Sequence, residues 1–159
     1  VNIFDAQIMT NKDGYAMDTF VILEQNGEPV NSPSRQQSIK RALELYIQDK
    51  PDLSRQKTRL SRQMRQFNVP PKVVFLPGNT SKRTMIELAA LDTPGLLANI
   101  GEVFQRCDVN IHAAKITTIG ERAEDFFMIS NSDDQALSSE QQSLLKRALI
   151  EQLSQQTEG

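Results

Sequence analysis

An internal repeat limits the folds available to this chain more than any other feature of its sequence. The segment VNIFDAQIMT at 1–10 returns as VNIHAAKITT at 109–118, with six of the ten positions identical. With one extra residue allowed in the first turn, the match continues through Ala16, Asp18 and Phe20, which align with Ala123, Asp125 and Phe127. SRQQSIKRAL at 34–43 then matches SEQQSLLKRAL at 139–149. A shared order of strand, turn, strand and helix indicates a duplication.

Hydrophobic periodicity predicts the elements of each copy. In the first copy it predicts strands at 1–10 and 15–24, a helix that begins at Ser34 and ends before Pro51, and a short strand in KVVFLP. In the second copy it predicts strands at 84–90, 109–119 and 123–130, a helix at 94–107 and a final helix. Ser138 with Gln141, or Ser139 with Gln142, is expected to form a capping box for that helix.

The two copies complement each other. The first copy lacks the strand and helix that precede VNI in the second copy, and the second lacks the closing strand that KVVFLP gives the first. Together they define a β-α-β-β-α-β unit, the ferredoxin-like order, in which two helices cover one face of an antiparallel sheet. We therefore expect an α+β fold with domains at 1–77, including a basic segment at 50–71, and at 78–159. We expect a fragment of a longer protein whose first unit rearranges or associates with another copy.

Composition and charge limit the class of protein and its cellular compartment. Hydrophobic residues are 38% and charged residues 24%, and the chain shows neither a membrane-spanning apolar run nor a signal-peptide pattern. Its one cysteine cannot form an internal disulfide, which favours the cytoplasm. Residues 50–67 carry six basic side chains against Asp52, a charge of +5. We expect a solvated linker there rather than a nucleic-acid surface, because Phe67 is its only aromatic residue.

No catalytic constellation is evident in the sequence. It contains neither a dinucleotide-binding glycine fingerprint nor a P-loop, and His112 is its single histidine. We expect His112 to have a structural or ligand-lining role. Cys107 falls on the apolar stripe of the 94–107 helix, where we expect a packed thiol rather than a reactive one.

The most informative stretch is LDTPGLLANI at 91–100. Asp92 or Thr93 is expected to cap the helix, with Pro94 in its first turn and Gly95 allowing another backbone to come close. Free amides at the start of a helix attract a carboxylate or a phosphate. We expect Asn110 at the same end of the unit, with Asn2 as its counterpart in the repeat. This combination suits an amino acid as ligand.

At these residues the chain resembles the ACT domain, a small ligand-sensing module of β-α-β-β-α-β fold. GYAMDTFVILE, VVFLPGNTSKRTMIELAALDTPGLLANIG and ITTIGERAEDFF together resemble the C-terminal tandem ACT region of the bacterial bifunctional uridylyltransferase/uridylyl-removing enzyme family. The resemblance implies a glutamine sensor that shifts the balance between two activities toward the PII nitrogen-regulatory protein. It places the nucleotidyltransferase and metal-dependent HD phosphohydrolase domains upstream, with Mg expected there and no cofactor in this chain.

The resemblance also implies the residues of the ligand site. The loop that holds the ligand carboxylate would comprise Asp92, Pro94, Gly95, Leu96 and Leu97. The facing strand would contribute Asn110 and Ile111, or their repeats Asn2 and Ile3. The first copy has no loop of this kind, so only one of the two expected sites has its loop in this chain.

Two other functions fit the same element order. One is a nucleic-acid-binding domain like the RRM, although the glycine and interleaved aromatics of the RRM strand motif are absent. The other is an assembly module that binds neither ligand nor nucleic acid. We favour the sensor, which would act through differential binding. We expect L-glutamine, the upstream catalytic domains and PII as partners, a homo-oligomer for the fragment, and neither a membrane nor nucleic acid.

Overall fold

The computed structural model describes residues 1–11, 13–49, 70–77 and 82–155. Its strands are β1 Asn2–Thr10, β2 Ala16–Leu23, β3 Lys72–Phe75, β4 Thr84–Leu91, β5 Asn110–Ile119 and β6 Arg122–Ser130. Its helices are α1 Pro33–Asp49, α2 Leu96–Arg106 and α3 Ser139–Gln155. The predicted α+β class and the order of elements are confirmed. The basic segment at 50–67 lies outside the described residues.

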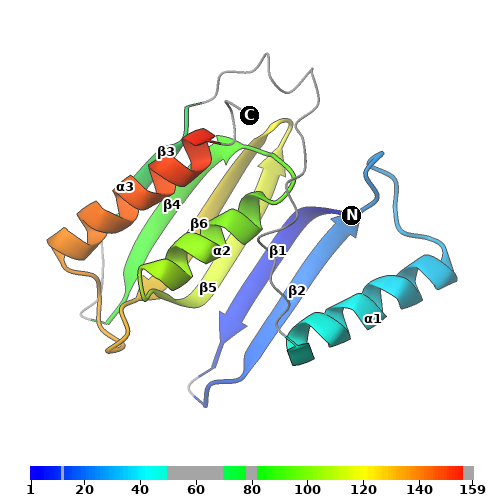
Figure 1. Cartoon of the computed structure of the whole chain (residues 1–159), viewed down its shortest axis with the longest axis horizontal. Coiled ribbons are helices and arrows are strands. Elements are labelled where there is room, and N and C mark those ends of the chain that lie inside the picture. The colour runs from blue at the N-terminus through cyan, green and yellow to red at the C-terminus, as the bar shows by residue number, and fades with distance from the viewer. Residues whose placement is uncertain (12, 50–69, 78–81, 156–159) are drawn as a thin grey trace.

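One sheet of six strands, in the order β2-β1-β5-β6-β4-β3, joins the two copies of the repeat (Figure 1). Every neighbouring pair of strands is antiparallel. The copies meet where β1 pairs with β5, with Asp5 opposite Thr117 and Met9 opposite Ala113. These two strands carry the VNI repeat, so the duplicated strands pair with each other in the middle of the sheet.

The second copy forms the main core. Helices α2 and α3 lie side by side over one face of its strands (Figure 1). Phe104 of α2 meets Phe127 of β6 edge-on, with ring centroids 5.1 Å apart. The predicted capping box of α3 is present, since the Ser138 N–H donates to Gln141 Oε1 at 2.9 Å and the Gln141 N–H donates to Ser138 Oγ at 3.2 Å.

The place of β3 in the sequence predicted that it would close the sheet of the first copy. It does not. It pairs with β4, with Val73 opposite Leu88, and forms the edge of the sheet on the side away from β2. The physical reason is that the first copy lacks its initial strand, beside which a closing strand would pair, whereas β4, the initial strand of the second copy, offers a free edge at that position. This position agrees with the rearrangement expected from the sequence. The domain boundary at 77/78 remains a prediction.

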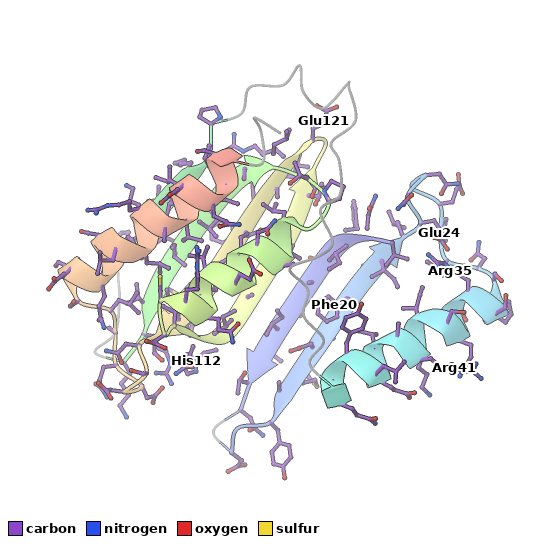
Figure 2. All side chains as sticks on the ribbon, viewed as in Figure 1. Phe20, Glu24, Arg35, Arg41, His112 and Glu121 are labelled. Atoms are coloured by element: carbon purple, nitrogen blue, oxygen red, sulfur yellow. The ribbon has the colours of Figure 1, made fainter. Side chains whose placement is uncertain are left out.

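In residues 1–11 and 13–49, the first copy therefore consists of β1, β2 and α1. As the missing strand and helix predicted, this copy does not form a complete four-stranded sheet under two helices in the described part of the chain. Helix α1 lies beyond β2, and an ion pair between Arg35 Nε and Glu24 Oε1, 3.0 Å apart, links it to the end of that strand (Figure 2). Of its described side chains from Pro33 to Gln48, only Ile39 is even partly buried. No described helix is both long and apolar enough to cross a membrane.

Candidate ligand-binding site

The connection between β4 and α2 contains the motif that the sequence singled out. Gly95, with φ 85°, is the N-cap residue of α2 and makes no side-chain cap hydrogen bond. The helix therefore begins at Leu96, two residues later than predicted, and neither Asp92 nor Thr93 is its N-cap. The positive φ explains this difference, because a residue in the left-handed region cannot continue into the helix.

Gly95 has a conformational role rather than the packing role that was predicted. A side chain built on it would meet nothing closer than Asn99 Nδ2 at 3.8 Å, so no other backbone approaches it. Pro94 and Gly95 are exposed, while Leu96 is buried in the core and Leu97 is half-buried against it. The loop is thus anchored by Leu96 and open to solvent at Pro94 and Gly95.

Backbone hydrogen bonds fix the loop at both ends. The Asp92 N–H donates to the Glu121 carbonyl oxygen at 2.8 Å, which ties the loop to the β5–β6 turn. The Leu96 N–H donates to the Thr93 carbonyl oxygen at 3.0 Å, so this amide is engaged and does not point freely outward as expected. The first turn of a helix still carries partial positive charge, and anions are favoured there.

Asn110 lies at the opposite end of the sheet from this loop, contrary to the prediction. Leu91 and Ile119 are both opposite Arg122, at the loop end, whereas Asn110 is opposite Ser130. Figure 2 shows the same separation, with Glu121 at one end of β5 and β6 and His112 at the other. The error has a simple cause: α2 crosses the full length of the sheet, so the strand that follows it begins at the far end.

Asn2 and Ile3 lie at the loop end instead. Strand β1 runs antiparallel to β5, and Asp5 is opposite Thr117, so the residues before Asp5 approach the last residues of β5. Ile3 is partly buried and packs against the core, while Asn2 is exposed. Of the two pairs left open by the sequence, Asn2 and Ile3 are the ones that the sheet places at the end of the Asp92–Leu97 loop.

Asn110 and Ile111 line a separate open hollow of about 510 Å³ beside the C-terminal half of α2. Its other lining residues are Gly101, Phe104, Gln105, Asp108, Val109 and Ser132. The Asn110 side-chain amide donates to the Asn131 carbonyl oxygen at 3.3 Å. The partial charge at this end of a helix is negative, so it does not favour a carboxylate.

His112 and Cys107 have the structural surroundings that were expected of them. His112 Nε2 lies 2.8 Å from Ser130 Oγ and 3.5 Å from Asp134 Oδ1, and its pKa is lowered by burial and by Arg83. Cys107 packs against the core, and burial raises the pKa of its thiol. The described part of the chain contains no cluster of three or more His, Cys, Asp or Glu side chains that would hold a metal ion.

Two aspartates, Asp92 in the loop and Asp125 in β6, have raised pKa values. Burial raises the pKa of Asp92, partly offset by a hydrogen bond from the Thr118 hydroxyl. Burial also raises the pKa of Asp125, to about 7, and the Asp92 carboxylate adds to this shift. Sequence reasoning missed Asp125, although a signal was present. In the alternating strand AEDFFMIS, Asp125 occupies an inward position between Ala123 and Phe127.

Comparison with known proteins identifies a clear set of relatives. No protein-family model matches the chain. It is 49% identical over 153 residues to the bifunctional uridylyltransferase/uridylyl-removing enzyme of Pseudoalteromonas translucida. It is 46% identical over 151 residues to the enzyme of that name from Aliivibrio fischeri, and 43% identical over 155 residues to the one from Vibrio cholerae.

These matches cover 96%, 94% and 98% of this chain, respectively. The chain spans 17% to 18% of the length of these relatives. The resemblance predicted from the sequence motifs is confirmed, because nearly the whole chain matches a segment of proteins with this name.

Proposed function

We propose that this chain is the amino-acid-sensing regulatory part of a bifunctional uridylyltransferase/uridylyl-removing enzyme, and that its ligand is L-glutamine. The observation that carries the proposal is the β4–α2 loop. It presents solvent-open backbone at Pro94 and Gly95 beside the positive end of α2, at the end of the sheet where β1 of the other copy begins. The names of the relatives support the parent enzyme, and the loop supports the ligand class.

The chemistry of the loop suits an α-amino acid. A ligand carboxylate would bind at the start of α2, where the helix dipole and the remaining N–H groups favour an anion. The exposed Asn2 side chain offers both amide donors and an acceptor for the polar part of the ligand. Leu96 and Leu97 hold the loop against the core, and Ile3 does the same for β1.

The regulatory mechanism would be differential binding. Glutamine would favour one arrangement of the paired copies and so bias upstream nucleotidyltransferase and HD phosphohydrolase domains, which transfer UMP to the PII protein and remove it. Those domains would use Mg, and this chain would contribute no cofactor. The cytoplasmic setting expected from the sequence belongs to the same proposal.

Isothermal titration calorimetry with L-glutamine tests the proposal, with L-glutamate and L-alanine as control ligands. We expect saturable binding of glutamine alone. Asn2→Ala should weaken it about tenfold, which corresponds to the loss of one or two hydrogen bonds. Asn110→Ala is the matched control, since this residue has the same place in the repeat but lies at the other end of the sheet.

The variants separate the possible results. If Asn110→Ala weakens binding and Asn2→Ala does not, the ligand occupies the hollow beside α2 and the assignment of the loop is wrong. If glutamine does not bind at all, the sensor is rejected for this chain and an assembly function becomes the better explanation.

A further inference from the structure

Asp125 is a buried carboxyl group without a hydrogen-bond partner. It lies in the middle of β6, between Ile116 of β5 and Leu88 of β4, and its residue is 1% exposed. Neither carboxyl oxygen has a hydrogen-bond partner in the described part of the chain. The Thr117 N–H is near enough to lower the pKa of the group but does not reach hydrogen-bond geometry. Such a group is costly to keep and calls for an explanation.

The strand positions between Asp125 and the β4–α2 loop carry small side chains. The next row of the sheet toward the loop contains Ala90, Ala123 and Thr118, all on the face that α2 covers. Thr118 donates a hydrogen bond to Asp92, which is the first residue of the loop. Asp92 follows Leu88, the residue opposite Asp125, by four residues, and its carboxylate acts electrostatically on Asp125 across this row of small side chains.

Within residues 1–11, 13–49, 70–77 and 82–155, no other ionisable side chain on the surrounding elements compensates this pair. The sheet register places Glu87, Lys115 and Glu124 on the opposite face. The charged residues of the two covering helices are all exposed: Glu102 and Arg106 on α2, and Glu140, Lys146, Arg147 and Glu151 on α3. In the described part of the chain, Asp92 is the one charged residue that shifts the pKa of Asp125, and its effect is repulsive. Because burial and the Asp92 carboxylate both make ionisation of Asp125 costlier, a positive charge beside the two groups would be stabilised.

We propose that Asp92 and Asp125 bind the ammonium group of the amino-acid ligand, while the start of α2 binds its carboxylate. This inference rests on the proposed function and adds the group that distinguishes an amino acid from a simple carboxylic acid. The two halves of the site suit the ligand, because ammonium and carboxylate are attached to the same carbon of an α-amino acid and Asp92 lies four residues before Leu96.

Binding would then release a proton. The free protein holds a proton on Asp125 up to neutral pH, and the ligand enters with its ammonium group already charged. Pairing with that ammonium stabilises the carboxylate form, so the carboxyl proton leaves to solvent and the ammonium keeps its own protons. The number of protons released should approach one per ligand below about pH 7 and fall above it, where Asp125 is already ionised.

Calorimetry with L-glutamine in two buffers of different ionisation enthalpy measures this proton directly. We expect release at about pH 6, and we expect Asp125→Asn to abolish the release and to weaken glutamine binding at least tenfold. Glutaramate, which is glutamine without its amino group, should bind the wild type and Asp125→Asn equally. Asp18→Asn is the matched control, because Asp18 aligns with Asp125 in the repeat but is exposed.

Carbon NMR of the Asp125 carboxyl in the unsubstituted chain provides a second measurement that does not depend on a variant. Saturating glutamine should lower its apparent pKa by at least about one unit. If potassium chloride alone does the same, the pair is a metal-cation site and the assignment to an amino acid is overturned. If glutamine binds with no proton release and an unchanged carboxyl pKa, the inference fails while the proposed function stands. If glutamine does not bind, both fail.

Discussion

Helices α1 and α3 carry the same sequence motif, but only α3 is buried. Each has 17 residues, and their matched segments align Leu43 with Leu149 and, one turn later, Ile47 with Leu153. Leu149 and Leu153 are 0% and 4% exposed, whereas Leu43 and Ile47 are 56% and 76% exposed. An amphipathic pattern therefore indicates that a helix is able to bury one face. Whether the face is buried depends on whether part of the sheet lies beside it.

The missing layer is a pair of strands. Helix α3 packs over the part of the sheet that contains β3 and β4, and it contacts β3. In the first copy no described strand corresponds to β4, and β3 has joined the second copy, so none of the described strands lies under α1 in their place. The strands show the same contrast, since Phe127 of β6 is 3% exposed and its counterpart Phe20 of β2 is 45% exposed.

The largest difference between the copies should appear in matched truncations of their helices. We expect Leu149→Ala to lower the free energy of unfolding by about 2–5 kcal/mol, because it leaves a cavity in the main core. Leu43→Ala should change it by less than about 0.5 kcal/mol, since this side chain is exposed. Urea unfolding followed by circular dichroism measures both. A similar loss in the two variants would mean that α1 is packed against the rest of the molecule in solution.

Asp125 and its counterpart in the repeat, Asp18, should contribute differently to the pH dependence of stability. The pKa of Asp125 is raised from 3.8 to about 7 in the folded state, so between these values the folded protein holds a proton that the unfolded chain releases. Stability should therefore fall as pH rises from about 4 to about 7, by at most about 1.4 kcal/mol per pH unit, and then level off.

Asp125→Asn should remove this contribution, and Asp18→Asn should leave it in place. Unfolding midpoints measured across this pH range in the wild type and both variants provide the comparison. A slope that survives in Asp125→Asn would assign the titration to another group, and Asp92 is the first candidate because burial raises its pKa as well.

The sequence was sufficient to predict an element or a contact wherever neighbouring residues along the chain determine it. Alternation predicted the strands, Ser138 and Gln141 predicted the cap of α3, and the apolar stripe predicted the packed environment of Cys107. The loop at Asp92–Gly95 was located from its motif. Its backbone conformation was not, because a Pro-Gly pair fits either a helix start or a turn that precedes one.

Sequence reasoning failed where the outcome depends on which strands pair. KVVFLP carries no information about whether β2 or β4 offers an edge to β3, and that competition was decided by a strand absent from the first copy. The place of Asn110 was misjudged because the end at which β5 begins follows from the direction of α2. The unpaired state of Asp125 likewise depends on what three strands place around it.

Two glycines with nearly the same backbone provide a finer comparison of the copies. Gly95 has φ 85° and leads into the buried helix α2, whereas Gly27 has φ 83° and lies in the connection to the exposed helix α1. Alanine in the left-handed region costs about 1–2 kcal/mol. We expect Gly95→Ala to lower the global free energy of unfolding by about 1 kcal/mol. In Gly27→Ala the strain should be relieved by local opening, with faster hydrogen exchange in α1 and a smaller global loss. Equal global losses would show that the two copies unfold as one unit.

The smallest effect we expect is on self-association. The first copy exposes apolar side chains on α1 together with the unpaired edge of β2, and surfaces of this kind favour contact with a second copy. Ile47→Glu should weaken that contact several-fold, because it places a charge on the most exposed apolar residue of α1. Leu144→Glu is the matched control on α3, where the side chain is 53% exposed but its helix is already packed. Light scattering across a concentration series distinguishes the variants. If the wild type stays monomeric throughout, the exposed face of α1 does not pair two copies, and the homo-oligomer expected from the sequence is wrong for this chain.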